Sequence, residues 1–313
     1  MTPDHDVVVV GGGPGGCAVG VFTARAGLDT LLFDRGRSSI ARCAHLENYL
    51  GFPAGVDTET FAALCRDHTE TAGCVIEPDL VESVERLDGS TDQEARFRVH
   101  PQDGASVTAA RVVAATRYDA AYLRGLDDTA AMFRTVDDEQ YLRDDYADHE
   151  GTTPVEGLYV VSPSDEDTQA LVVAGRGARV GRRVVADTRI ADGWWEAAAT
   201  GRVDWRRRAA ELGAEWHDRD RWVEWFDERH ADAPVDQHSE RYRRVREAAI
   251  DEARDSYIDG ETERDRAERG QARLADHLDP AAVVDGVGTD ELLDAMADAA
   301  IRAYLDREPV VGD

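Results

Sequence analysis

The chain has 313 residues, enough for one large domain or two ordinary domains with a substantial core. Its 64 acidic residues outnumber its 36 basic ones, all of which are arginine, and the net charge is -28. A charge this negative disfavours binding to nucleic acid or to an anionic membrane surface. It suits a protein kept soluble in concentrated salt, where screening shortens the range of repulsion between its own charges to about 3 Å. We therefore expect a halophilic, archaeal source.

Two further features bear on where the protein works. No apolar run approaches the roughly 20 residues of a membrane span, and the N-terminus enters a predicted strand without a signal segment. We therefore expect a cytoplasmic protein. The four cysteines show neither a CxxC pair nor the spacing of zinc ligands, so in a reducing compartment we expect them to be thiols.

A complete βαβ unit opens the chain. Four consecutive valines, residues 7–10, predict a strand buried on both faces of a parallel sheet. Glycines spaced Gly-x-Gly-x-x-Gly follow at Gly11, Gly13 and Gly16. An apolar-faced helix that Gly27 stops then leads to a second strand, residues 30–33, which ends at Asp34.

This order of elements is typical of dinucleotide binding. The first glycine permits the tight turn, the second lets backbone N–H groups approach a pyrophosphate, and the third lets helix and strand pack closely. Asp34 follows the last glycine by 18 residues, where a carboxylate accepts hydrogen bonds from ribose hydroxyls. The alternative is that the glycines only build a tight turn, although strand, helix, second strand and acid all follow in the required order.

The next 80 residues continue the α/β pattern. A polar, irregular connection, residues 35–57, is long enough to be functional. A helix over residues 58–72 and a short strand over 74–77 follow. Three strands are then expected to form an antiparallel meander, with a short buried strand after it: residues 81–87, 95–100, 106–111 and 112–115.

At this point the residues carry a family resemblance. The segments GGGPGG, ARAGLDTLLFD, ENYLGFPAGVD and RVVAATRYDAAYLRGL resemble, in sequence and order, the FAD-binding half of thioredoxin reductase-like flavoproteins. The resemblance covers about residues 6–187. It implies a Rossmann-like FAD-binding domain over residues 1–190, with a parallel sheet and an antiparallel β-meander. It further implies that the ADP part of FAD is held by Gly11, Gly13, Pro14, Gly16, Asp34 and Arg35.

Members of that family insert an NADPH-binding domain that carries its own glycine fingerprint and a CxxC motif, and both are missing from this sequence. Instead, a linker of about 40 residues leads to a segment similar to the family's return to the FAD domain. There a final helix, expected from about Thr168, points its N-terminus at the flavin, and the alternative is an ordinary helix covering the sheet. The resemblance gives the flavin side of the site as Thr116, Asp165, Gln169 and Ala170.

Two positions depart from the family pattern. The family's Thr-Gly after the meander is Thr116-Arg117 here, so a large cation stands where glycine lets backbone approach the cofactor. The family's Gly-Asp aligns with Ser162-Pro163, which removes the carboxylate that would hold the ribityl chain. Asp165, two places later, is the candidate to replace it.

Reactive groups are expected in residues 38–50, because in the resembling proteins this connection runs past the isoalloxazine ring. Cys43 and His45 are therefore the candidate catalytic residues, with Cys43 as a nucleophile, a sulfenic-acid former or a charge-transfer donor. Arg42 and a protonated His45 would favour its thiolate. The alternative is that Cys43 is a small apolar filler and His45 a surface residue.

The remaining residues, 191–313, are predicted to form an α-helical C-terminal extension. All six tryptophans lie between positions 194 and 225. Helices are expected near residues 205–230, 239–278 and 289–305, the middle one with only a thin apolar stripe that needs a partner. The tryptophans either cover the flavin, form a homodimer contact or dock the helices onto the α/β domain.

These observations predict an FAD-dependent oxidoreductase of the thioredoxin reductase-like superfamily whose partner is a small-molecule substrate or a redox protein. The alternative is a degenerate module that binds FAD or only an adenine nucleotide and acts as a scaffold or sensor. A third alternative, an NAD-dependent dehydrogenase, fits the glycines but not ENYLGFPAGVD and ATRYDAAYLRGL.

Overall fold

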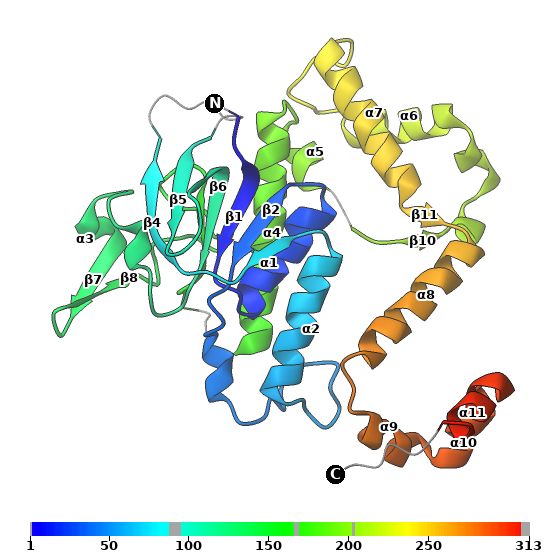
Figure 1. Ribbon diagram of the computed structural model, residues 1–313. Helices are drawn as coiled ribbons and strands as arrows, with labels where there is room; N and C mark the ends of the chain where they lie inside the picture. Colours follow the sequence, from blue (N-terminus) through cyan, green and yellow to red (C-terminus); the bar gives the residue numbers. More distant parts are fainter. Residues whose placement is uncertain (1, 88–94, 166–168, 202–203, 308–313) are drawn as a thin grey trace. The chain divides into compact units, whose positions relative to one another are not determined.

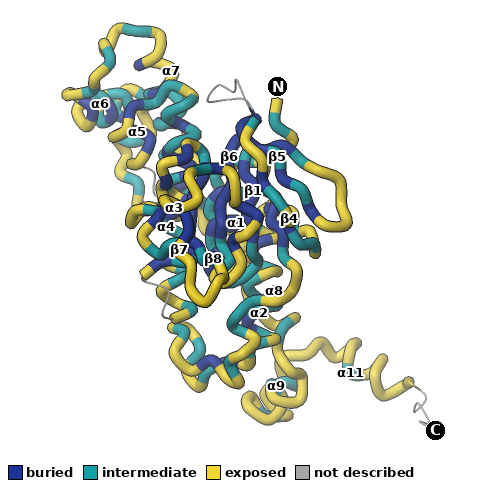
Figure 2. Tube along the Cα trace, turned by 90° about the vertical axis from the view of Figure 1, so that its left-hand side faces the viewer, coloured by how far each residue is buried: buried dark blue, intermediate teal, exposed yellow. Residues whose placement is uncertain are grey.

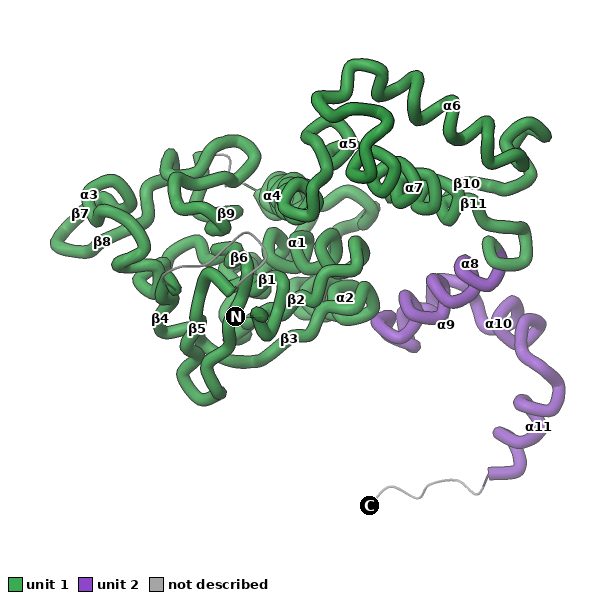
Figure 3. Tube along the Cα trace, turned by 90° about the horizontal axis from the view of Figure 1, so that it is seen from above, with its two compact units in different colours: residues 1–263 green, residues 264–313 purple. Residues whose placement is uncertain are grey.

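The computed structural model describes residues 2–87, 95–165, 169–201 and 204–307. The chain divides into two compact units, residues 1–263 and residues 264–313 (Figure 3). The predicted domain boundary after residue 190 lies inside the first unit and stays a prediction.

The first unit is built around a seven-stranded sheet (Figure 1). Its parallel part has the strand order β3-β2-β1-β6-β9, and the antiparallel strands β5 and β4 extend it from the other end of β6. The strands are β1 (His5–Val10), β2 (Thr30–Phe33), β3 (Val75–Glu77), β4 (Val81–Arg86), β5 (Phe97–Pro101), β6 (Val107–Ala115) and β9 (Leu158–Ser162). The predicted α/β class, a parallel sheet with an antiparallel meander, is confirmed.

The strand β6 differs from its prediction as two separate strands, 106–111 and 112–115. It is one nine-residue strand because no turn residue interrupts its apolar sequence. Its beginning pairs antiparallel with β5, its end pairs parallel with β9, and β1 runs along its other edge. Residues 88–94, between the strands predicted at 81–87 and 95–100, lie outside the described residues.

The four valines of β1 are buried on both faces of the sheet, as their sequence predicts. Val7 and Val9 pack on the side of α1 (Pro14–Arg25) and α4 (Ala170–Ala191). Val8 and Val10 pack on the opposite side against a second cluster that includes Phe97. Figure 2 shows β1 in the dark-blue, buried centre of the α/β part.

Close packing of α1 against α4 brings the N-termini of the two helices together. A Cβ added at Gly177 of α4 would lie 2.1 Å from the Gly15 carbonyl oxygen of α1, so only glycine permits this approach. The helix α4 begins at Ala170 with Gln169 as its N-cap, and the predicted start at Thr168 lies outside the described residues. A third helix, α2 (Thr58–Thr71), packs beside α1.

The connection between β6 and β9 carries structure that the sequence did not reveal. It contains a short helix, α3 (Thr129–Met132), and a hairpin of β7 (Phe133–Val136) and β8 (Glu139–Leu142). The hairpin turn uses Asp137 and Asp138 at φ of 49° and 64°. This turn lacks the usual Asn-Gly or Asp-Gly signal, because both left-handed positions are aspartate.

The helices of the extension are shorter than predicted. Before α6, the stretch expected to be helical over 205–230 holds a two-residue strand and two short 3₁₀ turns, Ala209–Glu211 and Ala214–His217. The helix expected over 239–278 is interrupted after Asp255. The interruption has a physical cause, because Tyr257 and Ile258 form β11, which pairs with β10. The elements are α5 (Glu196–Thr200), β10 (Arg207–Arg208), α6 (Arg219–Arg229), α7 (Glu240–Asp255), β11 (Tyr257–Ile258) and α8 (Gly260–Ala275).

The aromatic residues of the extension form a separate small core. Trp195 stacks on Tyr242 with ring centroids 5.3 Å apart, and Phe226 meets both rings edge-on. Tyr242 and Val245 of the predicted apolar stripe are fully buried in this core. Most of the tryptophans therefore pack within the extension itself, whereas Trp205 is 70% exposed.

The second unit continues α8 and adds three short helices, α9 (Pro280–Val287), α10 (Thr289–Ala295) and α11 (Asp298–Leu305). The helix predicted over 289–305 is broken at Met296 and Ala297, whose backbones are extended. Among the described residues, no helix combines the length and the apolar character needed to cross a membrane.

Candidate cofactor-binding site

A cleft of about 700 Å³ opens at the carboxyl ends of β1, β2 and β6. Such a volume suits a cofactor or another small molecule. In a parallel sheet this edge is where loops and helix N-termini meet, which is why ligands bind there. The N-terminal ends of α1 and α4 both reach it, through Pro14 and Ala170.

The floor of the cleft is the glycine turn between β1 and α1. Gly11 has a φ of +114°, and an added Cβ there would lie 2.7 Å from the Ala115 carbonyl oxygen. A Cβ at Gly16 would lie 1.8 Å from the Gly11 carbonyl oxygen, so Gly16 serves packing and does not line the cleft. Gly13 is the N-cap of α1, whose first turn contains no acidic residue. Backbone N–H groups at this end are therefore available to an anion.

Asp34 is fixed above this turn. An added Cβ at Gly12 would meet the Asp34 Cγ at 2.2 Å, so the carboxylate lies directly against the glycines. Its Oδ1 accepts a hydrogen bond from the Gly36 N–H at 2.9 Å, and its Oδ2 accepts one from Arg66 Nη2 at 2.8 Å. Pairing with Asp34 raises the pKa of the Arg66 guanidinium. The carboxylate thus has a defined orientation and retains lone pairs for ribose hydroxyls.

Arg66 is a site residue that sequence reasoning missed. It lies on α2, 32 residues beyond Asp34, and contacts the carboxylate only because α2 packs beside α1. Neither its spacing nor its neighbours in the sequence signal that contact.

One wall of the cleft is the connection after β2, which contains the 3₁₀ turn Ser39–Arg42. Cys43 lines the cleft, and its thiol donates to the backbone carbonyl of His45 at 3.0 Å. The His45 imidazole lies outside the cleft lining, with its Nε2 3.2 Å from the Ala54 carbonyl oxygen. The catalytic roles of Cys43 and His45 stay predictions.

The opposite wall follows β6. Thr116 Oγ1 lies 2.9 Å from the hydroxyl of Tyr122, whose pKa is raised by complete burial. Beyond it, the exposed ring of Tyr118 carries the guanidinium groups of Arg42 and Arg117 at 5.1 and 5.3 Å from its centroid. These cation–π contacts join the two walls of the cleft.

The predicted flavin side is only partly assembled. Gln169 and Ala170 line the cleft, and Gln169 Oε1 accepts a hydrogen bond from Asn48 Nδ2 at 2.7 Å. Asp165 is exposed and is not among the lining residues. Its role as a replacement carboxylate stays a prediction. Arg35 does line the cleft and lies 3.5 Å from Asp119 across it.

The other three cysteines are free thiols that do not line the cleft, although the Cys17 thiol donates to the Gly12 carbonyl oxygen at 3.4 Å. Burial raises the pKa of Cys17 to about 11 and the pKa values of Cys65 and Cys74 to about 12. These thiols therefore stay protonated at neutral pH.

Comparison with known proteins identifies the family. The family model described as pyridine nucleotide-disulphide oxidoreductase matches residues 5–177, which is more than half of the chain. The chain belongs to this family. FAD is the cofactor that membership of the pyridine nucleotide-disulphide oxidoreductases assigns to it.

Individual relatives match shorter parts. Thioredoxin reductases of Listeria monocytogenes and Bacillus subtilis are 42% identical over 50 residues, 15% of this chain and 16% of each relative. Among solved structures, the atypical thioredoxin reductase TRi from Desulfovibrio vulgaris Hildenborough is 15% identical with a TM-score of 0.48, covering 62% of this chain and all of that one. A thioredoxin reductase from Gloeobacter violaceus is 16% identical with a TM-score of 0.48, over 66% of this chain and all of that one.

The residues of this pyridine nucleotide-disulphide oxidoreductase fit the ADP half of FAD. The glycine turn leaves no room for a Cβ at Gly11, Gly12 or Gly16, and Asp34 stands beside the turn where a ribose would lie. Among the described residues, four arginines and three aspartates line the cleft, a small positive excess in a strongly acidic protein. That charge suits a pyrophosphate.

Proposed function

We propose that this chain is an FAD-dependent oxidoreductase related to thioredoxin reductases, acting on a small molecule or a redox protein. One observation carries the proposal: the glycine turn, Asp34 and the N-termini of α1 and α4 converge on a single cleft of about 700 Å³. Membership of the family supports the redox chemistry. The substrate is not specified by the lining residues.

Each part of the cleft has a separate task in this proposal. The backbone around Gly13 and Gly15 holds the pyrophosphate, and Asp34 accepts hydrogen bonds from the ribose. FAD supplies the hydride or electron transfer when bound. The N-terminus of α4, at Gln169 and Ala170, favours negative charge in the cleft by about 0.3–1 kcal/mol at an exposed position. Such a contribution raises the reduction potential of a group bound there.

The electron source and the reactive thiol are further parts of the proposal. We infer that electrons come from the substrate, from freely bound NAD(P)H or from a partner protein, because the sequence carries no second glycine fingerprint or CxxC motif. Cys43 is the proposed reactive group, since its thiol lines the cleft.

The test is the optical spectrum of the protein purified in concentrated salt. The proposal expects a yellow protein whose flavin absorbance bleaches anaerobically with dithionite and with a physiological reductant such as NADPH. If Cys43 lies against the flavin, a long-wavelength charge-transfer band should be present in the wild type and in Ser39→Ala, on the same wall, and absent in Cys43→Ser. A yellow protein that no biological reductant bleaches would contradict the catalytic role.

A specific observation favours the second candidate, a degenerate nucleotide-binding module that acts as a scaffold or sensor. Arg42, Tyr118 and Arg117 stack together in the cleft, and Asp165 lies outside it. A module that holds only an adenine nucleotide would be colourless and would bind ADP as tightly as FAD, whereas one that holds FAD would be yellow and would not be reduced by any biological reductant. Measuring both affinities on one preparation separates the two candidates.

Three properties of the whole protein complete the proposal. The net charge of -28 supports a halophilic, cytoplasmic protein that does not bind nucleic acid or membranes. Lowering the salt concentration should therefore unfold it through self-repulsion. We also propose that the extension is available for a homodimer contact, which light scattering in concentrated salt would test.

A further inference from the structure

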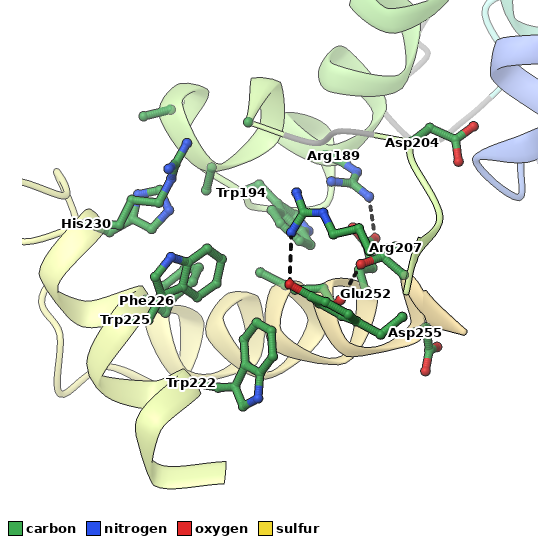
Figure 4. A pocket seen from close by; sticks show the side chains of 18 of the residues that line it. Arg189, Trp194, Asp204, Arg207, Trp222, Trp225, Phe226, His230, Glu252 and Asp255 are labelled. Atoms are coloured by element: carbon green, nitrogen blue, oxygen red, sulfur yellow. Dashed lines mark hydrogen bonds and ion pairs between the residues drawn. The ribbon is translucent and has the colours of Figure 1, made fainter. Parts of the chain in front are cut away.

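A second cavity, of about 490 Å³, lies within the extension (Figure 4). Its wall is formed by the end of α4, the segment that follows it, and the helices α6 and α7. Side chains from all of these elements converge on it, among them Arg189, Trp194, Trp222 and Glu252. It shares no lining residue with the cofactor cleft.

Aromatic rings dominate the cavity wall. Trp222 and Phe226 are buried, whereas Trp194, Trp225 and Tyr257 are only half-buried. The Arg189 guanidinium lies 4.6 Å from the ring centroid of Trp194, and the Arg207 guanidinium lies 5.6 Å from that of Tyr257. Trp222 meets Trp225 edge-on, with ring centroids 5.7 Å apart. A planar ring that enters such a cavity gains stacking and edge contacts from several sides.

The charged residues of the wall are unequally paired. Arg189 bonds to Glu252, and Asp204 accepts two hydrogen bonds from Arg25 at 2.6 and 2.9 Å. Within the described part of the chain, the three remaining lining arginines have no carboxylate partner. These are Arg206, Arg207 and Arg229.

Asp255 is the lining acid without an arginine partner among the described residues. The unpaired groups therefore leave an excess of two positive charges. The chain has 64 acids for 36 arginines, so carboxylate partners are abundant elsewhere. Arg207 Nη1 does donate to the Tyr257 hydroxyl at 3.4 Å, which leaves its charge without a counter-ion. A group of exposed arginines without carboxylate partners in such a chain points to an anion that arrives from solution.

His230 adds an uncharged donor to the cavity wall. Trp195 Nε1 donates to its Nδ1 at 3.4 Å, which leaves the Nε2 of the neutral ring as an N–H donor. Burial and the adjacent Arg229 lower the pKa of His230, so the ring is neutral at pH 7. The neighbouring charged groups of the wall are Arg189, Arg229 and Glu252.

We propose that this cavity is a binding site for a planar heteroaromatic ring that carries a phosphate monoester, the chemistry of a mononucleotide. A phosphate monoester bears a charge of about -1.5 to -2 at pH 7, which matches the excess of two positive charges. Guanidinium groups bind phosphate oxygens through paired hydrogen bonds, and indole rings stack on nucleobases. The cavity volume lies within the usual range for such ligands.

This site is separate from the cofactor cleft. Gln169 lines the cleft at the start of α4, and Arg189 lines the cavity 20 residues later on the same helix. At a rise of 1.5 Å per residue, these residues lie about 30 Å apart. A ligand in the cavity is thus too distant to exchange a hydride with FAD directly. The inference does not rest on the proposed redox function.

Tryptophan fluorescence of the full chain tests the proposal, because all six tryptophans lie between residues 194 and 225. AMP is the probe, titrated at the lowest salt that keeps the protein folded. We expect AMP to change the fluorescence saturably. The Arg206→Gln/Arg207→Gln double variant should bind AMP at least about tenfold more weakly, because charge-assisted hydrogen bonds are lost.

The matched control is Arg243→Gln, an exposed arginine of α7 that does not line the cavity. It should keep the AMP affinity within about twofold of the wild type. Adenosine and inorganic phosphate each carry one half of the proposed ligand. The affinity for each should be lower than the affinity for AMP by at least about tenfold.

Four results would overturn the proposal. These are an unchanged fluorescence up to saturating AMP, an unchanged affinity in the double variant, adenosine binding as tight as AMP, or phosphate binding as tight as AMP. The first two results would exclude the site. The third would exclude a role for the phosphate in binding, and the fourth would exclude stacking of the ring.

Discussion

The cofactor cleft and the aromatic cavity of the extension are built in different ways. The cleft is built on a glycine turn, strand ends and the N-termini of α1 and α4, and more than half of its described lining residues lie between positions 10 and 46. The cavity is made of side chains from residues 189–257, brought together by helix packing. Backbone sites leave a spacing pattern in the sequence, whereas side-chain sites of this kind do not.

The largest expected effect is a loss of stability in the extension that leaves the cofactor cleft intact. Phe226→Ala removes a fully buried ring from the core of the extension and should cost about 3–5 kcal/mol in the free energy of unfolding. If the extension folds as its own core, tryptophan fluorescence should report earlier unfolding in denaturant while flavin absorbance keeps its wild-type midpoint. Coincident loss of both signals would contradict that separation. Trp205→Ala, at a 70% exposed position, is the control and should cost under about 0.5 kcal/mol.

A backbone substitution should break the cleft instead. Gly16→Ala places a Cβ 1.8 Å from the Gly11 carbonyl oxygen, so the turn must shift. We expect a loss of about 1–3 kcal/mol in the free energy of unfolding together with loss of bound FAD. Denaturant unfolding and the ratio of flavin to protein absorbance measure the two effects.

Gly175→Ala is the matched control for that substitution. Gly175 lies within α4, and an added Cβ there meets nothing within 4 Å. The change should stabilise the helix by up to about 1 kcal/mol and leave FAD bound. Equal damage from the two substitutions would contradict the account of the glycine turn.

Arg66 sharpens the comparison, because its hydrogen bond to Asp34 is a side-chain contact between residues far apart in the sequence. Arg66→Gln removes the bond to Asp34 Oδ2 and should weaken FAD binding by up to about fivefold, since half-exposed pairs contribute little. Equilibrium dialysis measures this change. Arg86→Gln, at an exposed position of β4, should leave the affinity unaltered. An Arg66→Gln loss larger than that of Asp34→Ala would contradict its role as a positioning residue.

The smallest expected effect is a pH dependence confined to the extension. The pKa of His230 lies below its ordinary value of 6.5, so the unfolded chain takes up this proton first as the pH falls. Stability from the neutral ring is therefore present above pH 6.5 and is lost as the pH falls through the lowered pKa. The unfolding midpoint should drop less between pH 7.5 and 5.5 in His230→Gln than in the wild type. The exposed His238→Gln should follow the wild type, and an identical drop in all three proteins would refute the assignment.

The α/β fold could be predicted from the sequence because the patterns that indicate it lie within short stretches of the chain. The valines of β1, the glycine spacing and Asp34 each act within a few residues of their neighbours. The structure buries the valines in the sheet and places the glycine turn and Asp34 at one cleft. The hairpin at Asp137 and Asp138 was missed because its turn uses aspartates where glycine is usual.

Long-range contacts explain the other differences. The continuity of β6 depends on three partner strands, and the bond from Arg66 to Asp34 depends on how α2 packs. The helices of the extension were predicted too long, because the strand pairing of Arg207 with Tyr257 interrupts them and joins residues far apart in the sequence. The cavity of the extension left no spacing pattern that could be read in advance.

Quantitative FAD binding tests the central claim most directly. The cofactor-free protein in concentrated salt should bind one FAD per chain. Asp34→Ala should weaken that binding by about 10- to 150-fold, because it removes charge-assisted hydrogen bonds to the ribose. An FAD affinity that Asp34→Ala leaves unchanged, or no binding of FAD by the wild type, would contradict the assignment of this cleft.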